Sequence, residues 1–369
     1  MTDKLTFVCS NFVLIRFERS QIKHIGCEMD KTLQQLYFEV KANLEKLDFS
    51  KLWHDFKPLK FALYNDEQCF FDGIFVEKTD EFLANTAIQY NGETIAIWKV
   101  QGEIDSTILT SKIVHEMFHG FQKLGGECDD LEALYRYEYT AKNLSLKFKE
   151  NQLICDLLTE FNQDKFNDLL AIRKHRQKLF PYEFNYESLV EQIEGSATFV
   201  EIGVLKQLSP DLYEQALSQM KARAVCVNNL VPIRIISYDI GALFLLLLSE
   251  NNIEFVQEFN GAIYYDKLLE TACEQEISND VSYKVKAVVD NYYSLAHTEI
   301  STTLFKNDVV FSGESNLLAV NIYNAVYHCN HIISRCFVMY GNEDDRKIEY
   351  GDFVIVTKEI GKLTKIYRI

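Results

Sequence analysis

The spacing of the apolar residues changes twice along the chain, and this constrains the fold more than any other feature. Short apolar runs between residues 60 and 100 are typical of strands, and Asn91-Gly92 between two of them is a strong signal for a tight hairpin turn. Apolar residues then recur at helical spacing from about 106 to 297, and strand-like runs return after 298. Strands and helices segregated in this way predict an α+β fold.

We expect three regions along the 369 residues: an N-terminal α/β region with a mixed sheet at 1–105, a helical core at 106–297, and a small β-rich region at 298–369. The first region contains a strand-like start at 7–17 and a helical stretch at about 30–47. A chain of this length is long enough to bury a sizeable core.

The charge balance excludes some classes of partner. The chain has 38 basic and 54 acidic residues, a formal net charge of −16. Such a field repels the phosphates of nucleic acids and the anionic surfaces of membranes, so we expect neither as a partner. It is compatible with binding a multivalent cation.

Nine cysteines without a C-x-x-C pair are typical of a reduced intracellular protein. The N-terminal residues lack the layout of a secretory signal peptide. The longest apolar run, Ile240 to Leu248, has about half the length that a membrane span needs. These features predict a cytoplasmic protein.

The pattern His115-Glu116-x-x-His119 lies in a predicted amphipathic helix that Ser106 or Thr107 can cap. Positions i and i+4 share one face of a helix, so both imidazoles can reach the same metal ion. Glu116 lies about 100° around the helix, where it can contact a water on that metal without ligating it, as the general base of a zinc hydrolase does. The alternative is two histidines satisfied at a helix surface.

A catalytic zinc site needs a third protein ligand. Farther along, at positions 191–201, the chain reads Glu191-Gln-Ile-Glu194-Gly-Ser-Ala-Thr-Phe-Val-Glu201. The two motifs together resemble the gluzincin metallopeptidases, the thermolysin-like and aminopeptidase-N-like enzymes. In these, a helix with H-E-x-x-H is followed by one with Glu-Gly-x-Ala-x-aromatic-x-Glu. The resemblance implies that Glu194 is the third ligand of one zinc ion per chain.

Several other residues of the second motif bear on this assignment. Gly195 and Ala197 are small, so this helix can approach the first one closely enough for a carboxylate to bridge to the metal. Glu191 is the rival ligand, and Glu201 is a candidate partner of a ligating histidine. The alternative is an acidic, solvated helix face that also includes Glu187.

Tyr238 precedes Gly241 at helical spacing. Several zincin relatives have a tyrosine followed by such a glycine after the third-ligand helix. The resemblance implies that the Tyr238 hydroxyl donates a hydrogen bond to the oxyanion of the reaction. The alternative is an ordinary tyrosine at the start of a buried helix.

Two further groups are expected to be structural. His328 and His331 lie three positions apart in the strand-rich tail, where such a pair is more often structural than metal-binding. The basic run from Arg173 to Arg176 is expected to form a solvated helix face.

The sequence therefore predicts a zinc-dependent metallohydrolase, a peptidase whose substrate is a peptide or protein. The strand at 94–100 is the expected sheet edge to which an extended substrate can add. Two alternatives stay open: a non-catalytic metal-binding or regulatory protein on a zincin-like scaffold, and an interaction protein without a metal. The sequence also leaves open the substrate, whether cleavage is internal or terminal, and the oligomeric state. It does not decide between zinc and another divalent metal.

Overall fold

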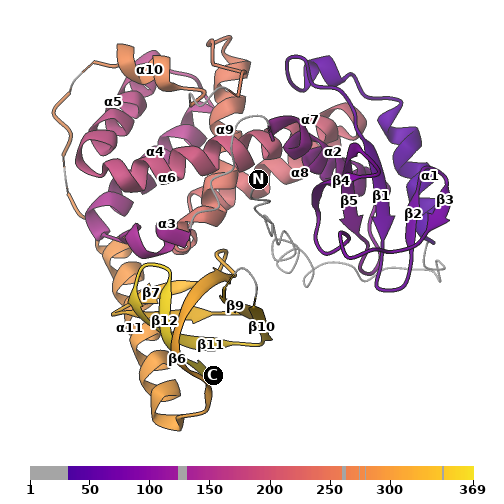
Figure 1. Cartoon of the computed structure of the whole chain (residues 1–369). Coiled ribbons are helices and arrows are strands. Elements are labelled where there is room, and N and C mark those ends of the chain that lie inside the picture. Colours follow the sequence, from indigo (N-terminus) through magenta and orange to yellow (C-terminus); the bar gives the residue numbers. More distant parts are fainter. Residues whose placement is uncertain (1–31, 124–130, 260–262, 274, 279, 343–344) are drawn as a thin grey trace, which may run out of the picture. The chain divides into compact units, whose positions relative to one another are not determined.

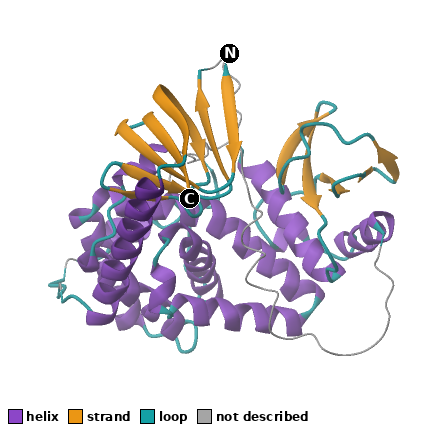
Figure 2. Cartoon of the chain, turned by 90° about the horizontal axis from the view of Figure 1, so that it is seen from below, coloured by secondary structure: helices purple, strands orange, loops and turns teal. Residues whose placement is uncertain are grey.

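The computed structural model describes residues 32–123, 131–259, 263–273, 275–278, 280–342 and 345–369. The predicted strand at 7–17 lies outside these residues. The α+β class is confirmed, with two separate sheets and many helices (Figure 2). The chain divides into two compact units, the first within 1–127, 191–221 and 241–266 and the second within 128–190, 222–240 and 267–369. The predicted three-region division remains a prediction.

The first unit contains a five-stranded sheet in the order β3-β2-β1-β5-β4 (Figure 1). The β1–β5 pair is parallel and the other neighbours are antiparallel. The strands are β1 (Lys60–Tyr64), β2 (Cys69–Phe71), β3 (Ile74–Val76), β4 (Thr86–Tyr90) and β5 (Glu93–Lys99).

The predicted hairpin is confirmed, because β4 and β5 flank Asn91 and Gly92. Both turn residues have positive φ values, 51° and 82°, as a type I′ turn requires. The prediction of an edge at 94–100 is wrong. β5 pairs with β1 on one side and β4 on the other, so among the described strands β4 is the edge on this side of the sheet.

Helices pack against this sheet. α1 (Leu33–Leu44) contacts β1 and β2, and α2 (Ser106–Gln122) contacts β4 and β5. Asp105 caps α2 by accepting from the backbone N–H groups of Thr107 and Ile108, one residue before the predicted cap. The first unit also contains the short helix η2 (Phe49–Lys51), the π-helical turn η3 (Glu191–Gly195) and α7 (Ser196–Leu208). Residues of both units contribute to α8 (Pro210–Ala224), α9 (Ile233–Glu250) and α10 (Asp266–Thr271).

Within the first unit, η3 touches α9 through two glycines. A Cβ atom added to Gly195 would lie 2.6 Å from Gly241 Cα, and one added to Gly241 would lie 2.7 Å from the carbonyl oxygen of Glu191. Gly195 was expected to allow a close approach to α2. Its nearest neighbours instead belong to α9, because adjacent helical residues point about 100° apart and Glu194 already faces α2.

The second unit combines helices with a seven-stranded antiparallel sheet in the order β10-β9-β6-β12-β11-β8-β7. α11 packs against β7, β8, β11 and β12, with Ala296 and Ile300 in one apolar cluster with Ile333 and Val354. The helices are α3 (Leu131–Arg136), α4 (Ala141–Leu157), α5 (Gln163–Leu179), α6 (Pro181–Val190), η4 (Val227–Leu230) and α11 (Tyr283–Lys306). The strands are β6 (Val309–Val320), β7 (Val326–His328), β8 (His331–Ser334), β9 (Phe337–Gly341), β10 (Arg346–Tyr350), β11 (Phe353–Glu359) and β12 (Lys362–Arg368).

The helices of the second unit enclose a network of charges. Arg176 donates to Glu150 Oε1 at 3.1 Å and to Glu187 Oε1 at 2.7 Å, and Lys147 lies 3.2 Å from the second oxygen of Glu187. The expectation of a solvated basic face is wrong here, since Arg173 and Arg176 are each only 1% exposed. Their charges are tolerated in the interior because carboxylates accompany them.

No helix in the described part of the chain has the length and apolar character to cross a membrane.

The glycine contact yields a stability prediction. Gly195→Ala should lower the free energy of unfolding by about 1–3 kcal/mol, the usual effect of an extra carbon in a packed contact. The added carbon meets the backbone of α9, which cannot turn aside as a side chain can. Urea denaturation followed by circular dichroism measures the change.

Gly203→Ala is the matched control in α7. Its new Cβ atom would approach only Leu52 Cδ2, the flexible end of a side chain, at 2.9 Å. Equal losses of stability in the two variants would contradict a special role for the Gly195–Gly241 contact.

Candidate metal centre

Three predicted ligands lie together in the first unit. The Nε2 atoms of His115 and His119, one turn apart on α2, are 3.1 Å from each other. Glu194 Oε2 lies 3.3 Å from His119 Nε2 and 3.9 Å from His115 Nε2. Among the residues that the structure describes, these three form the group whose ligand-type atoms all lie within 4.8 Å of one another. The arrangement can hold one metal ion.

The backbone around Glu194 is irregular. Residues Glu191–Gly195 form a single π-helical turn between α6 and α7. Such turns are rare and occur frequently at functional sites, because the extra residue changes the direction of the side chains that follow. Here Glu194 points to the histidines of α2, whereas Glu191 is buried but is not part of the three-residue group.

The acidic residues of this segment do not form a solvated face. Glu187, Glu191, Glu194 and Glu201 are all buried, with 1–9% of their surface exposed. A buried carboxylate requires a cation or hydrogen-bond donors. The solvated-face alternative is therefore wrong.

Glu201 contacts the outer nitrogen of His115. Its Oε2 lies 3.0 Å from His115 Nδ1, and its Oε1 lies 2.6 Å from Lys112 Nζ. Burial would raise the pKa of Glu201, but Lys112 and His115 outweigh it and lower that pKa to about 2. The two atoms form an ion-pair contact without hydrogen-bond geometry. An ionised carboxylate only accepts protons, so this contact favours a proton on His115 Nδ1 and leaves Nε2 towards the group.

Gln122 contacts the outer nitrogen of His119. Its Nε2 donates to the carbonyl oxygen of Ile193 and to Ser196 Oγ, both at 2.8 Å, so its Oε1, 2.7 Å from His119 Nδ1, must accept. His119 Nδ1 is then the protonated nitrogen of the neutral ring, and its Nε2 also faces the group with a lone pair. Sequence reasoning missed Gln122, although its position seven residues after His115 on one helix face was a usable signal.

The two Nε2 atoms and the Glu194 carboxylate can share a proton or a metal ion. Burial disfavours a charge on His115, but Glu194 and Glu201 outweigh it and raise the pKa of His115 to about 10. The pKa of His119 is raised in the same way, with Glu194 outweighing burial. In the absence of a metal a proton therefore stays in the group at neutral pH. A metal ion must displace it, so the affinity should increase as the pH rises.

Glu116 is placed differently from the ligands. Its side chain is 3% exposed, and its Oε2 has no hydrogen-bond partner among the described residues. Burial raises the pKa of this carboxyl group above its usual range, despite the two neighbouring histidines. A buried carboxylate oxygen without a protein partner is suited to binding a water molecule or a reacting group.

Tyr238 lies on α9 and is half-buried. It belongs to the second unit, whereas His115, His119 and Glu194 belong to the first. Its role as an oxyanion donor stays a prediction.

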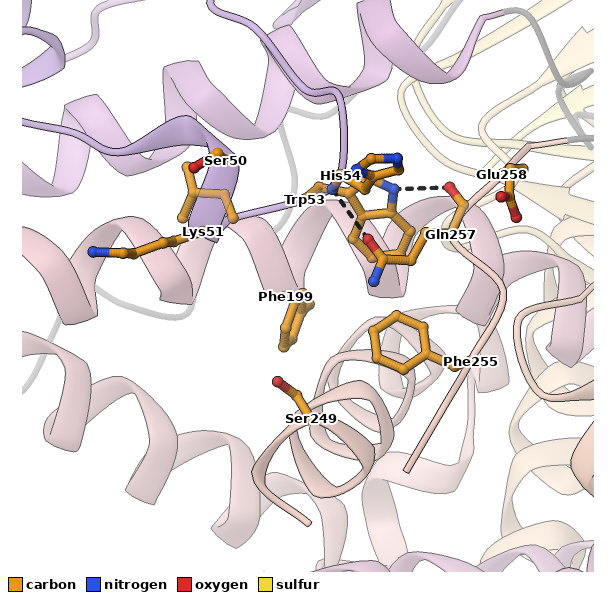
Figure 3. Close-up of a pocket in the computed structure, with 10 residues that line it drawn as sticks. Ser50, Lys51, Trp53, His54, Phe199, Ser249, Phe255, Gln257 and Glu258 are labelled. Atoms are coloured by element: carbon orange, nitrogen blue, oxygen red, sulfur yellow. Dashed lines mark hydrogen bonds between the residues drawn. The ribbon is translucent and has the colours of Figure 1, made fainter. Parts of the chain in front are cut away.

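A separate cavity of about 480 Å³ lies in the first unit (Figure 3). Trp53, Phe199 and Phe255 supply aromatic walls, and the polar rim includes His54 and Gln257. Trp53 Nε1 donates to the Gln257 carbonyl oxygen at 2.9 Å, and the backbone N–H of His54 donates to Gln257 Oε1 at 3.0 Å. None of the three candidate metal ligands lines this cavity.

Comparison with known proteins gives no relative. No known protein family, curated protein or solved structure matches the chain.

The assignment of the third ligand is testable by zinc titration. Glu194→Ala should weaken zinc binding by more than the ~10–100-fold that follows loss of an outer partner, and so should His115→Ala and His119→Ala. Glu191→Ala is the matched control, since Glu191 lies on the same turn but outside the group. The zinc affinities are measured by competition with a chelator. A larger loss of affinity in Glu191→Ala than in Glu194→Ala would make Glu191 the third ligand.

The contact between Glu201 and His115 gives a second prediction. Glu201→Gln keeps the shape of the side chain but removes the charge that fixes the proton on His115 Nδ1. Zinc affinity should fall by about 10–100-fold, measured by the same competition. Glu214→Gln, at an exposed position on α8, should leave it unchanged. An unchanged affinity in Glu201→Gln would reduce this contact to a structural ion pair.

Proposed function

We propose that this chain is a zinc-dependent metallohydrolase that cleaves peptide bonds. The observation that carries the proposal is Glu116, a buried carboxylate with an unpartnered oxygen, directly following the first residue of a two-histidine, one-carboxylate group. A purely structural metal site has no use for such a carboxylate. The resemblance of the two motifs to gluzincin metallopeptidases supports the same reaction class.

The donor set suits zinc. Two imidazole nitrogens and one carboxylate oxygen are the three protein ligands of many catalytic zinc sites, which leave a fourth position open. A zinc ion held there would lower the pKa of a coordinated water and polarise the substrate carbonyl.

Glu116 is the proposed proton carrier. Its carboxylate accepts a proton from the attacking water and delivers it to the leaving amine. A raised pKa brings its proton affinity nearer to neutral pH, where both transfers are efficient. Burial also keeps bulk water from competing for the oxygen.

The proposed binding position for the peptide is the edge strand β4. Tyr90 and Glu93, which flank the turn, form a hydrogen-bonded pair, and hydrogen-bonded pairs then alternate with non-hydrogen-bonded pairs along the β4–β5 hairpin. Ala87 and Gln89 belong to non-hydrogen-bonded pairs. Their backbone N–H and C=O groups therefore point away from β5. An extended peptide can pair with these groups as an additional strand. Lys123, an exposed residue just after α2, donates to the Ala87 carbonyl oxygen and would give way to a substrate N–H.

Glu116→Gln tests the mechanism directly. The substitution is nearly isosteric, so the protein should fold and bind zinc, but peptide hydrolysis should fall by about 10²–10⁴-fold or more because the proton carrier is lost. The readout is turnover of a quenched fluorescent peptide library together with the zinc content of each preparation.

Glu103→Gln, at an exposed position before α2, is the control and should retain full turnover. A folded, zinc-loaded Glu116→Gln protein with wild-type turnover would remove Glu116 from the reaction. A zinc-loaded wild type that cleaves no peptide would favour a non-catalytic metal-binding protein.

A further inference from the structure

A second group of metal-ligating side chains lies within the second unit, where α11 meets the β7–β8 hairpin. His297 comes from α11, His328 ends β7, His331 begins β8, and Cys329 lies in the turn between the strands. None of these residues takes part in the proposed hydrolysis.

The topology brings the imidazoles to one surface. His328 and His331 are directly opposite each other in the hairpin register, so both side chains are on the same face of the sheet. Val326 and Ile333, each two residues from one of these histidines, pack in an apolar cluster with Ala296 of α11. The face that carries both histidines is therefore the one that α11 covers.

One pair of donor atoms already has the spacing of metal ligands, but the donor atoms of the four residues do not all lie within 4.8 Å of one another. Cys329 Sγ lies 3.4 Å from His328 Nε2, and the ring centroids of His297 and His328 are 6.1 Å apart. In a tetrahedral zinc site with Zn–S of about 2.3 Å and Zn–N of about 2.0–2.1 Å, sulfur and nitrogen are about 3.5 Å apart. His297 is exposed, so a change of rotamer can bring its ring closer to His328.

The turn that carries the thiol is held in an uncommon conformation. Cys329 and Asn330 have φ values of 48° and 60°, a region that cysteine rarely adopts. The backbone N–H and the hydroxyl of Thr357 donate to the Asn330 carbonyl oxygen at 2.9 and 3.0 Å, and the Tyr327 hydroxyl donates to Asn330 Oδ1 at 3.0 Å. Surrounding hydrogen bonds thus fix a strained turn beside the histidines, as is common at ligand sites.

We propose that His297, His328 and Cys329 bind a second transition-metal ion, with His331 as the fourth donor. Imidazole and thiolate together favour zinc and similar borderline metals over calcium or magnesium. The ion would connect α11 to the β7–β8 hairpin and so stabilise this part of the second unit. Because His297 and Cys329 are exposed, this site is weaker than the buried one on α2.

Cobalt titration of the metal-free full-length protein distinguishes the two sites. Only the second site has a thiolate, and a cobalt–thiolate bond produces a charge-transfer absorption band in the near ultraviolet. The band should appear in the wild type and in a His115→Ala, His119→Ala double variant, and it should be lost in Cys329→Ser. Cys273→Ser, which changes another exposed cysteine of the same unit, should keep the band.

Zinc-dependent melting gives an independent readout in the same double variant. Zinc should raise its thermal midpoint, and the shift should disappear when Cys329→Ser or His328→Ala is added. Circular dichroism of each variant without zinc checks its folding. A wild type without the charge-transfer band, or a band that survives in Cys329→Ser, overturns the proposal. Absence of peptidase activity does not bear on it.

Discussion

The candidate metal centre depends on two imidazole nitrogens that face each other beside a carboxylate. His115 and His119 direct their Nε2 atoms at one point, with Glu194 across from them. Without a cation the three groups repel one another or keep a proton. Gln122 Oε1 accepts from His119 Nδ1, and the Glu201 carboxylate lies 3.0 Å from His115 Nδ1, so a polar group faces the outer nitrogen of each ring.

The two buried glutamates Glu116 and Glu187 show how surroundings separate a reactive carboxylate from a structural one. In the second unit, Arg176 and Lys147 outweigh the effect of burial on Glu187 and lower its pKa to about 2. Glu187 Oε1 accepts from Tyr137 and Arg176, and the ammonium group of Lys147 lies beside its second oxygen. Glu116 has a similar exposure, but burial dominates and raises its pKa. Two glutamates with a similar degree of burial thus have pKa values shifted in opposite directions.

The position of Glu194 results from packing on two sides of one turn. The π-helical turn directs Glu194 to α2, while Gly195 lies against Gly241 of α9 without room for a Cβ atom. The glutamate reaches the histidines because the adjacent residue has no side chain. This explains in physical terms why glycine follows the glutamate here.

The sequence by itself determined the features that depend on local spacing. The i, i+4 relation puts His115 and His119 on one helix face, Asn91-Gly92 specifies the hairpin, and the segregated periods specify the α+β class. Only the tertiary structure decided that β4 is the edge strand and that Arg173 is buried. The physical reason is that strand order and charge pairing depend on residues far apart in the chain, and a local pattern holds no information about which of them will meet.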